Sequence, residues 1–422
     1  MESDVSESTS VNTVIANVTV GANPEAPVFD RANGNVYVPT VGAMRLSVIS
    51  GSTDTVVATI SLLRPPGGVV YDGGNGDLYA ISPLSVSENV TVVSGTTELV
   101  TGTIPVGGYP LLPTYVSRNE DLYVPVSAVT PQEDGHLSVI SGSSNTVIST
   151  IAVGAFPDTP TYDAANSDLY VPNMDDDDVS VISATSNTII ATVPVGGSPD
   201  TPAYDSGDGD LYVPAVAETS GQTNHLSVIS GATNTVIATI PLGATAPGIP
   251  TYDPSNGDLY VASQSGGFAS GTVTVISGSN NSVVAVVTVG TLPQSPVYDP
   301  DNGNIYISND NSSSGTVSVI SGDTNTVTST ISVLSSPLAP AFDPSNGNLY
   351  VPDFNANTVS VIAGGLPGSG AESAPSSWYL ELVLIPGIST GVVIAGVAVL
   401  LQWRRGRIDG ASPPVGRDIP GG

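Results

Sequence analysis

A ten-residue stretch recurs along this chain and limits what the chain can fold into. Residues 252–261 read YDPSNGDLYV, residues 298–307 read YDPDNGNIYI, and residues 342–351 read FDPSNGNLYV. Alignment on the apolar-Tyr pair of this stretch gives eight copies, spaced 42 to 48 residues apart. Repeats of this period are typical of the four-stranded blades of a β-propeller. The eight tyrosines are Tyr37, Tyr79, Tyr123, Tyr170, Tyr212, Tyr260, Tyr306 and Tyr350.

Each copy contains four short β-branched runs separated by turn residues, which predicts four strands. In the sixth copy we expect them at 249–252, 258–262, 273–277 and 283–287. The recurring stretch joins the first two runs: Asp253 can accept backbone N–H bonds, and Pro254 fixes its own φ. The Asn-Gly pair that follows tolerates positive φ, so the stretch predicts a tight hairpin turn in every blade.

The two sets of connections differ in length. From the Asp before the first turn to the Tyr after it is seven residues, and the third copy keeps this spacing with Val116 in place of Asp. The connection from the Tyr to the third run varies from 9 to 14 residues. In an antiparallel blade these connections lie on opposite rims. We therefore expect a uniform rim and a variable rim, with function on the variable rim.

The chain ends supply the two parts of one blade. The eighth copy stops after its third run at 359–362, and residues 11–21, VNTVIANVTVG, form a fourth run that no blade precedes. Pairing these segments closes the ring. Proline ends the fourth run at Pro105, Pro194 and Pro241, which favours an outer edge strand. The sequence thus predicts an all-β, eight-bladed β-propeller over residues 11–364, after a polar N-terminus at 1–10.

The strand sequences resemble the YVTN-type β-propeller repeat family. The shared features are a Pro-rich entry, an Asp-rich turn, a Leu-Tyr-Val strand, a Thr/Val-Ser-Val-Ile strand and a Thr-Val-x-x-Thr-Ile-Pro-Val-Gly strand. The resemblance covers residues 11–364 and implies a propeller of a kind common on archaeal and bacterial cell surfaces. Most members have seven blades, so a seven-bladed ring remains the alternative, with the divergent second or third copy not forming a blade. The residues that carry the resemblance in the sixth copy are Pro250, Asp253, 259–261 and 273–276, and those at the end of the fifth copy are 236–243.

Charge and composition exclude one class of partner. The chain has 8 arginines, no lysine and 38 acidic residues, giving a formal charge of −30. A nucleic-acid-binding protein needs a basic patch, so we expect no nucleic-acid partner. Cysteine is absent, so disulfides and thiolate metal sites are excluded.

The C-terminal segment predicts a membrane anchor. After a Gly/Ser/Pro linker at 365–378, residues 382–401 contain no charge and are long enough to span a bilayer as a helix. Trp378 and Trp403 flank this stretch, as interfacial aromatic residues do. We therefore expect one transmembrane helix at 379–403. Arginines cluster in the tail at 404–422. By the positive-inside bias, we expect a single-pass protein whose tail lies in the cytoplasm and whose propeller lies outside the cell.

The first residues, MESDVSESTS, lack the basic and apolar regions of a signal peptide. We expect that the natural start lies upstream or that a signal has been removed. If Met1 is the start, the alternative is a tail-anchored protein whose propeller faces the cytosol.

Few residues are candidates for metal or catalytic chemistry. Asp175, Asp176, Asp177 and Asp178 lie in a variable-rim loop, and calcium prefers such oxygen ligands. The alternating spacing of a calcium loop is missing, and the other interpretation is a solvated charge run. The two histidines, His136 and His225, fall two blades apart and are best interpreted as loop-end residues without a shared metal.

These features support a non-enzymatic surface module as the first hypothesis. The propeller would bind an unknown surface protein or glycan through its long loops at 125–136, 214–225 and 262–272. The second hypothesis is a lactonase-like hydrolase or a lyase, because propellers of related repeat type include such enzymes. It requires titratable residues that point inward from several first strands. The first strands offer few such residues, so we expect no catalytic residues and no cofactor other than the calcium considered above.

Overall fold

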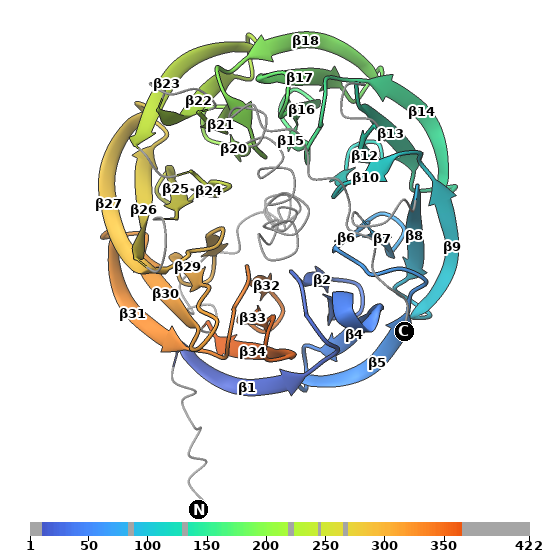
Figure 1. Ribbon diagram of the computed structural model, residues 1–422, viewed down its shortest axis with the longest axis vertical. Coiled ribbons are helices and arrows are strands. Elements are labelled where there is room, and N and C mark those ends of the chain that lie inside the picture. Colours follow the sequence, from blue (N-terminus) through green and yellow to red (C-terminus); the bar gives the residue numbers. More distant parts are fainter. Residues whose placement is uncertain are drawn as a thin grey trace, which may run out of the picture.

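A computed structural model of the protein describes residues 11–82, 88–128, 134–217, 223–243, 246–264 and 269–364. These residues form eight antiparallel sheets arranged as blades around one axis (Figure 1). The eight-bladed all-β prediction is confirmed, and the seven-bladed alternative is wrong. The divergent second and third copies each form a complete sheet.

Each blade runs outward from the axis in chain order. Blades 3 and 5 each contain a fifth, two-residue strand, and a short 3-10 turn, η1 (Val41–Ala43), follows β3. The blades are numbered along the chain. Blade 1 holds β2 (Val28–Asp30), β3 (Asn35–Thr40), β4 (Arg45–Ser50) and β5 (Thr55–Ser61); blade 2 holds β6 (Gly68–Tyr71), β7 (Asp77–Ile81), β8 (Asn89–Ser94) and β9 (Leu99–Pro105); blade 3 holds β10 (Tyr109–Pro110), β11 (Thr114–Val116), β12 (Asp121–Ser127), β13 (His136–Ser141) and β14 (Thr146–Ala152); blade 4 holds β15 (Thr161–Asp163), β16 (Asp168–Asn173), β17 (Asp178–Ser183) and β18 (Thr188–Pro194). Blade 5 holds β19 (Ser198–Pro199), β20 (Ala203–Asp205), β21 (Asp210–Val216), β22 (Asn224–Ser230) and β23 (Thr235–Gly243); blade 6 holds β24 (Thr251–Asp253), β25 (Asp258–Ser263), β26 (Ser270–Ser277) and β27 (Ser282–Thr291); blade 7 holds β28 (Val297–Asp299), β29 (Asn304–Asn309), β30 (Thr316–Ser321) and β31 (Thr326–Ser332); blade 8 holds β32 (Ala341–Asp343), β33 (Asn348–Asp353), β34 (Thr358–Ala363) and, from the other end of the chain, β1 (Thr13–Thr19).

Blade 8 is built from both ends of the described chain, as the sequence predicted. Strand β1 pairs antiparallel with β34, so Val18 lies opposite Val359 and Val14 lies opposite Ile362. This pairing supplies the fourth strand of blade 8 and closes the ring without a free blade face.

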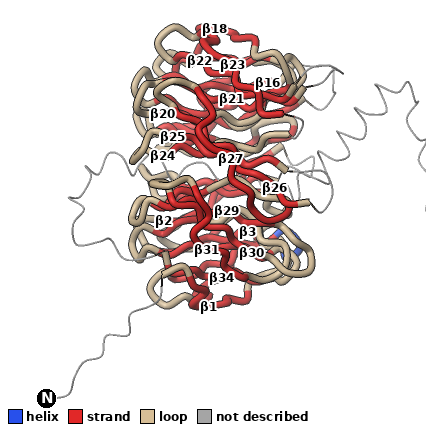
Figure 2. The backbone as a smooth tube through the Cα atoms, turned by 90° about the vertical axis from the view of Figure 1, so that its left-hand side faces the viewer, coloured by secondary structure: helices blue, strands red, loops and turns tan. Residues whose placement is uncertain are grey.

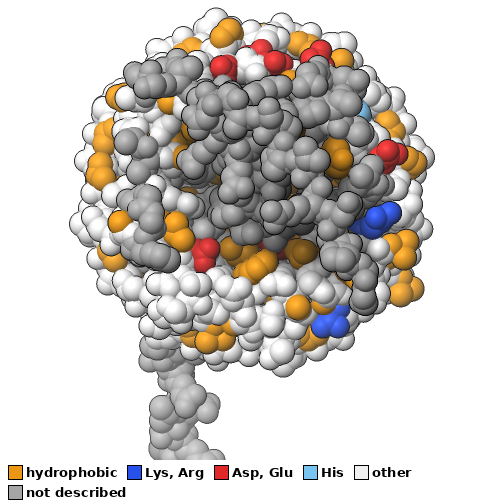
Figure 3. All heavy atoms as spheres, viewed as in Figure 1, with side chains coloured by type: hydrophobic (Ala, Val, Ile, Leu, Met, Phe, Trp, Pro, Cys, Tyr) orange, Lys and Arg blue, Asp and Glu red, His pale blue; other side chains and the backbone are white. Residues whose placement is uncertain are grey.

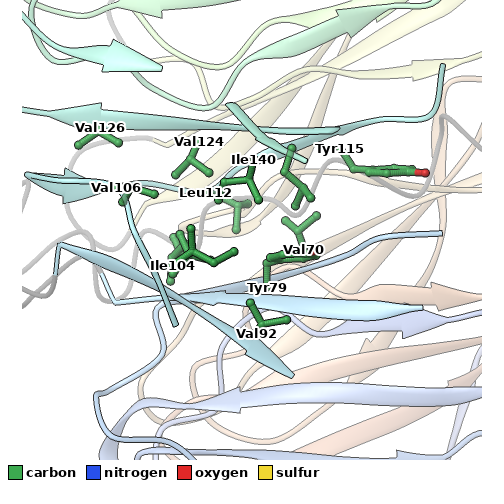
Figure 4. Packing of buried hydrophobic residues seen from close by; sticks show 13 residues of the cluster. Val70, Tyr79, Val92, Ile104, Val106, Leu112, Tyr115, Val124, Val126 and Ile140 are labelled. Carbon is green, nitrogen blue, oxygen red and sulfur yellow. The ribbon is translucent and has the colours of Figure 1, made fainter. Parts of the chain in front are cut away.

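Apolar side chains fill every junction between neighbouring blades. Eight buried clusters are present, and each one contains residues of two adjacent blades. Figure 4 shows the cluster between blades 2 and 3, where Tyr79 and Ile104 of blade 2 lie near Val124 and Ile140 of blade 3. Burial of these aliphatic and aromatic groups is the main contribution to stability, and the unbroken series of clusters is what an eight-bladed ring requires.

The recurring turn both folds its own hairpin and contacts the next blade. Asp253 Oδ1 accepts the Ser255 N–H at 2.8 Å, and Gly257 adopts φ +76°, as the sequence predicted. The Asn256 amide donates to the Tyr260 hydroxyl at 3.1 Å and to the carbonyl of Gly322, in blade 7, at 2.9 Å. The motif is therefore repeated because each inter-blade junction needs one copy.

The same contact recurs around the ring. In each blade the Tyr hydroxyl lies within hydrogen-bonding reach of the third-to-fourth turn of the next blade, and at the ring closure Tyr306 donates to Asn12 Oδ1 at 2.7 Å. Seven blades carry Asn at the position of Asn256, whereas blade 5 carries Asp208. The seven asparagines are Asn33, Asn75, Asn119, Asn166, Asn256, Asn302 and Asn346.

Viewed from the side, the ring is a disk with two rims and an outer edge formed by the fourth strands (Figure 2). The first-to-second and third-to-fourth turns share the uniform rim, because the inter-blade contacts above join them. Pro105, Pro194 and Pro241 are exposed on outer strands, as predicted. The ends of the predicted strands of blade 6 differ from the observed ends by at most four residues, and the largest differences arise because hydrogen bonding extends β26 and β27 into the flanking segments.

The linker at 365–378, the predicted transmembrane helix at 379–403 and the tail at 404–422 lie outside the described residues, as does the N-terminus at 1–10. Within the part of the chain that the structure describes, no helix is long and apolar enough to cross a bilayer.

Candidate functional site

Eight residues with equivalent positions surround the axis where each blade begins, and we call them the axial ring. In each blade the backbone N–H of this residue donates to a carbonyl near the end of the second strand, at 2.8–2.9 Å. This end of the second strand leads into the variable connection, so the axial ring lies on the variable rim. Its members are Glu25, Gly67, Leu111, Asp158, Asp200, Gly248, Gln294 and Leu338.

Two neighbouring members of the axial ring are aspartates. Asp158 precedes β15 in blade 4, and Asp200 precedes β20 in blade 5. Their carboxyl groups face each other closely enough for each one to shift the pKa of the other. The blade starts themselves are joined, because the Thr161 hydroxyl donates to the Pro202 carbonyl at 2.6 Å.

Burial controls the charge of this pair. Asp158 is only 7% exposed, and desolvation raises the pKa of its carboxyl above the ordinary value. Desolvation and the neighbouring Asp158 charge raise the pKa of Asp200 to about 7. The Asp158 carboxyl raises the pKa of Asp200, whereas the Asp200 carboxyl lowers that of Asp158, so Asp200 keeps its proton more readily. Near neutral pH the pair therefore gains or loses a proton as a unit.

Backbone and hydroxyl groups orient the two carboxyl groups. Asp158 Oδ1 accepts the N–H of Thr159 at 2.6 Å, and Asp200 Oδ1 accepts the N–H of Thr201 at 2.6 Å. Both sites read Pro-Asp-Thr-Pro, at 157–160 and 199–202. A pair with one proton held in fixed geometry can donate or accept a proton, or it can bind a cationic group.

The predicted calcium residues form a turn between β16 and β17. Asp176 Oδ2 accepts the Ala155 N–H at 2.8 Å, and Asp178 Oδ1 accepts an amide hydrogen of Asn173 at 2.7 Å. Asp177 has φ +56°, which is the left-handed region needed in this turn. Among the residues that the structure describes, no group of three or more His, Asp or Glu side chains is placed to hold a metal ion. Calcium at Asp175–Asp178 stays a prediction.

The two histidines have the same contact in different blades. His136 Nε2 lies 3.0 Å from the carbonyl of Val106, and His225 Nε2 lies 2.9 Å from the carbonyl of Val195. Each histidine contacts the end of the preceding blade's outer strand, and the two belong to blades 3 and 5. They are therefore loop-end residues that join blades, as the sequence indicated.

The long variable-rim loops are only partly described. Strand β12 extends to Ser127, and β13 begins at His136, so the predicted loop at 125–136 is shorter than expected at both ends. Residues 129–133, 218–222 and 265–268 lie outside the described residues. On the face drawn in Figure 3, charged side chains are few and scattered among polar and apolar ones.

Comparisons with known proteins extend to the fold and no further. No protein-family model matches the chain, and no curated protein matches it. Among solved structures, the chain is similar to the structure titled Kuenenia stuttgartiensis hydrazine synthase, with a TM-score of 0.56 over 86% of this chain and 99% of that chain. The sequences are 12% identical, so this likeness shows the fold alone. The fold and the closed ring define the class of protein: an eight-bladed β-propeller.

Proposed function

We propose that this protein is a cell-surface β-propeller of the YVTN-type, anchored by one helix, that binds an envelope component or another cell without catalysing a reaction. The observation that carries the proposal is the difference between the two rims. The uniform rim is used for the repeated Asn–Tyr contacts between blades, whereas the connections on the other rim vary in length. Length variation on a rigid scaffold is typical of recognition loops.

The longest connections belong to blades 3, 5 and 6, at 125–136, 214–225 and 262–272. Blades 5 and 6 are neighbours, because one buried cluster contains residues of both. We infer that the connections of these two blades serve one partner. Envelope glycans and surface proteins are the partners that such a polar rim suits, since hydroxyl and amide groups are available for hydrogen bonding.

The sequence of the C-terminal segment supports the anchor. Residues 382–401 are uncharged, aromatic residues flank them, and arginines follow. By the positive-inside bias, this order supports a propeller that lies outside the cell.

Binding to isolated envelopes tests the proposed function. Full-length protein would be mixed with purified envelopes, sedimented and quantified. Replacing loops 214–225 and 262–272 with the nine-residue spacing of the shorter blades should abolish retention in the pellet. Asn35→Ser on the uniform rim is the matched control and should bind as the native protein does. Equal retention of native and loop-replaced protein would refute binding through the variable rim.

The Asp158–Asp200 pair favours an enzyme as the second candidate. A hydrolase or lyase needs a group that takes a proton and a group that supplies one, and this pair offers both near neutral pH. The test is turnover of a panel of lactones by the full-length protein. Activity that Asp200→Asn removes, while Asp208→Asn retains it, would support the enzyme; no turnover of any lactone would reject this lactonase-type candidate.

A further inference from the structure

The outer edge of the disk is an uncharged band on a strongly acidic protein. Its eight strands contain no Asp, Glu, Lys or Arg, although the chain carries a formal charge of −30. Figure 1 shows these strands as the arcs that form the circumference, and Figure 3 shows apolar side chains recurring along it. The eight outer strands are β1, β5, β9, β14, β18, β23, β27 and β31.

Each outer strand carries a β-bulge at the same position. In blade 6, Val275 pairs with Ala285 and Ile276 pairs with Val283, so Val284 is the additional residue. The same irregularity occurs in the other seven blades. A bulge interrupts the regular row of edge N–H and C=O groups and so opposes strand addition by another chain. A partner at this edge would therefore contact side chains.

Strand β27 differs from the other outer strands in one residue. Val286 pairs with Thr274 of β26 and is 62% exposed. At the equivalent position of the pairing register, every other outer strand has a polar residue. Val283 and Val284, at 44% and 50% exposed, extend the apolar strip. β27 is also the longest outer strand, with ten residues. The polar equivalents of Val286 are Asn17, Thr59, Thr103, Thr150, Thr192, Thr239 and Thr330.

The core packing fixes which way this strip faces. Ala285 packs against the buried cluster between blades 6 and 7, and Val287 is part of that cluster. Successive side chains of a strand point to opposite faces, so Val284 and Val286 lie on the face directed away from the core. Figure 2 looks at this part of the edge, and β27 crosses the front of the disk there.

We propose that β27 is the contact through which two copies of this chain associate across a two-fold axis. A basic partner would be attracted to the acidic rims rather than to an uncharged strip. Two copies of this acidic chain repel each other at their rims, and the uncharged edge is where they can approach without that repulsion. A two-fold contact is self-complementary, so one apolar strip suffices for both sides. Three exposed valines with no charged neighbour in the strand fit this arrangement.

Sedimentation velocity of the full-length protein over a concentration series tests the proposal. Val286→Thr introduces the residue that six other outer strands carry, so the variant should fold. We expect it to raise the dimer dissociation constant about tenfold or more, because the change occurs twice per dimer. Ile237→Thr in β23 removes an aliphatic group that is 53% exposed and should leave the constant unchanged. A monomer at every concentration, or equal weakening by both variants, would overturn the proposal.

The absence of cysteine allows a second test of the same contact. Val284→Cys should form a covalent dimer under mild oxidation, because a two-fold axis near the middle of the strip brings the two thiols together. Ile237→Cys, which occupies the equivalent position in β23, should remain monomeric. Equal cross-linking of the two variants, or none with Val284→Cys, would exclude this axis.

Discussion

Asp208 occupies a position at which the other seven blades have an asparagine, and its replacement tests the inter-blade contact. In blade 6 the equivalent Asn256 donates to Tyr260 and to the Gly322 carbonyl, and a carboxylate cannot make either bond. The pKa of Asp208 is raised to about 6, mainly by desolvation and to a lesser extent by the nearby charges of Asp205 and Asp210. Asp208→Asn should therefore stabilise the folded protein.

The size of the gain follows from the bonds that the amide restores. Two neutral hydrogen bonds contribute roughly 0.5–1.5 kcal/mol each. Asp208 is exposed to solvent, which screens its charge and competes for these bonds, so we expect a total of about 1 kcal/mol. In a domain of this size, such a gain raises the unfolding midpoint by about 1–2 °C.

The pH dependence has a definite sign. The folded-state pKa of Asp208 is raised, so its ionised form is disfavoured in the fold, and wild-type stability falls as pH rises from about 4 to about 6. The gain from Asp208→Asn should be larger at pH 8 than at pH 4. Scanning calorimetry of the full-length protein measures both midpoints. Asn256→Asp is the reverse control and should lower the midpoint at pH 8 more than at pH 4. A midpoint for Asp208→Asn at pH 8 that is equal to or below that of wild type would refute the reasoning.

Three further predictions concern the axial pair, the ring closure and the edge contact. Because the pKa of Asp200 is raised to about 7, the wild-type midpoint should fall as pH rises from about 4 to about 7 and should level off above that. Asp200→Asn should flatten this dependence in calorimetry between pH 5 and pH 7, and a slope equal to that of wild type would contradict the raised pKa of Asp200. Val18→Asp places a carboxylate in the buried cluster of blades 8 and 1 and should cost about 3 kcal/mol or more, whereas Ile15→Asp, on the exposed side of the same strand, should cost less than about 1 kcal/mol. Equal midpoints for these two variants would show that β1 does not close the ring. Val286→Thr should weaken self-association without lowering the unfolding midpoint at protein concentrations at which both proteins are monomeric, and a lowered midpoint under that condition would instead indicate a packing role for Val286.

The repeat and the turns could be predicted from the sequence because they depend on local signals. Turn residues such as Asp253 and Gly257 act within four positions of each other, and the eightfold recurrence made the blade count explicit. The closure was predictable too, since an unpaired fourth run at one end matched an incomplete copy at the other.

The carboxyl pair was missed because its chemistry depends on neighbouring blades. Asp158 and Asp200 are 42 residues apart in sequence, and nothing local to either one shows that the two carboxyl groups face each other. A signal was nevertheless present, since Pro-Asp-Thr-Pro occurs in two consecutive copies at the same distance before the first strand. The enzyme hypothesis required titratable residues on the first strands, whereas Asp158 and Asp200 lie just before β15 and β20. The bulges on the outer strands were not predicted either, because they arise from pairing register rather than composition.

Protease treatment of intact cells measures whether the propeller lies outside the cell. The closed ring should resist digestion, whereas the Gly/Ser/Pro linker at 365–378 should be cut. We predict that an intact fragment containing residues 11–364 is released from unbroken cells into the supernatant. Release only after lysis would contradict the surface location and would favour the tail-anchored alternative, with the propeller facing the cytosol.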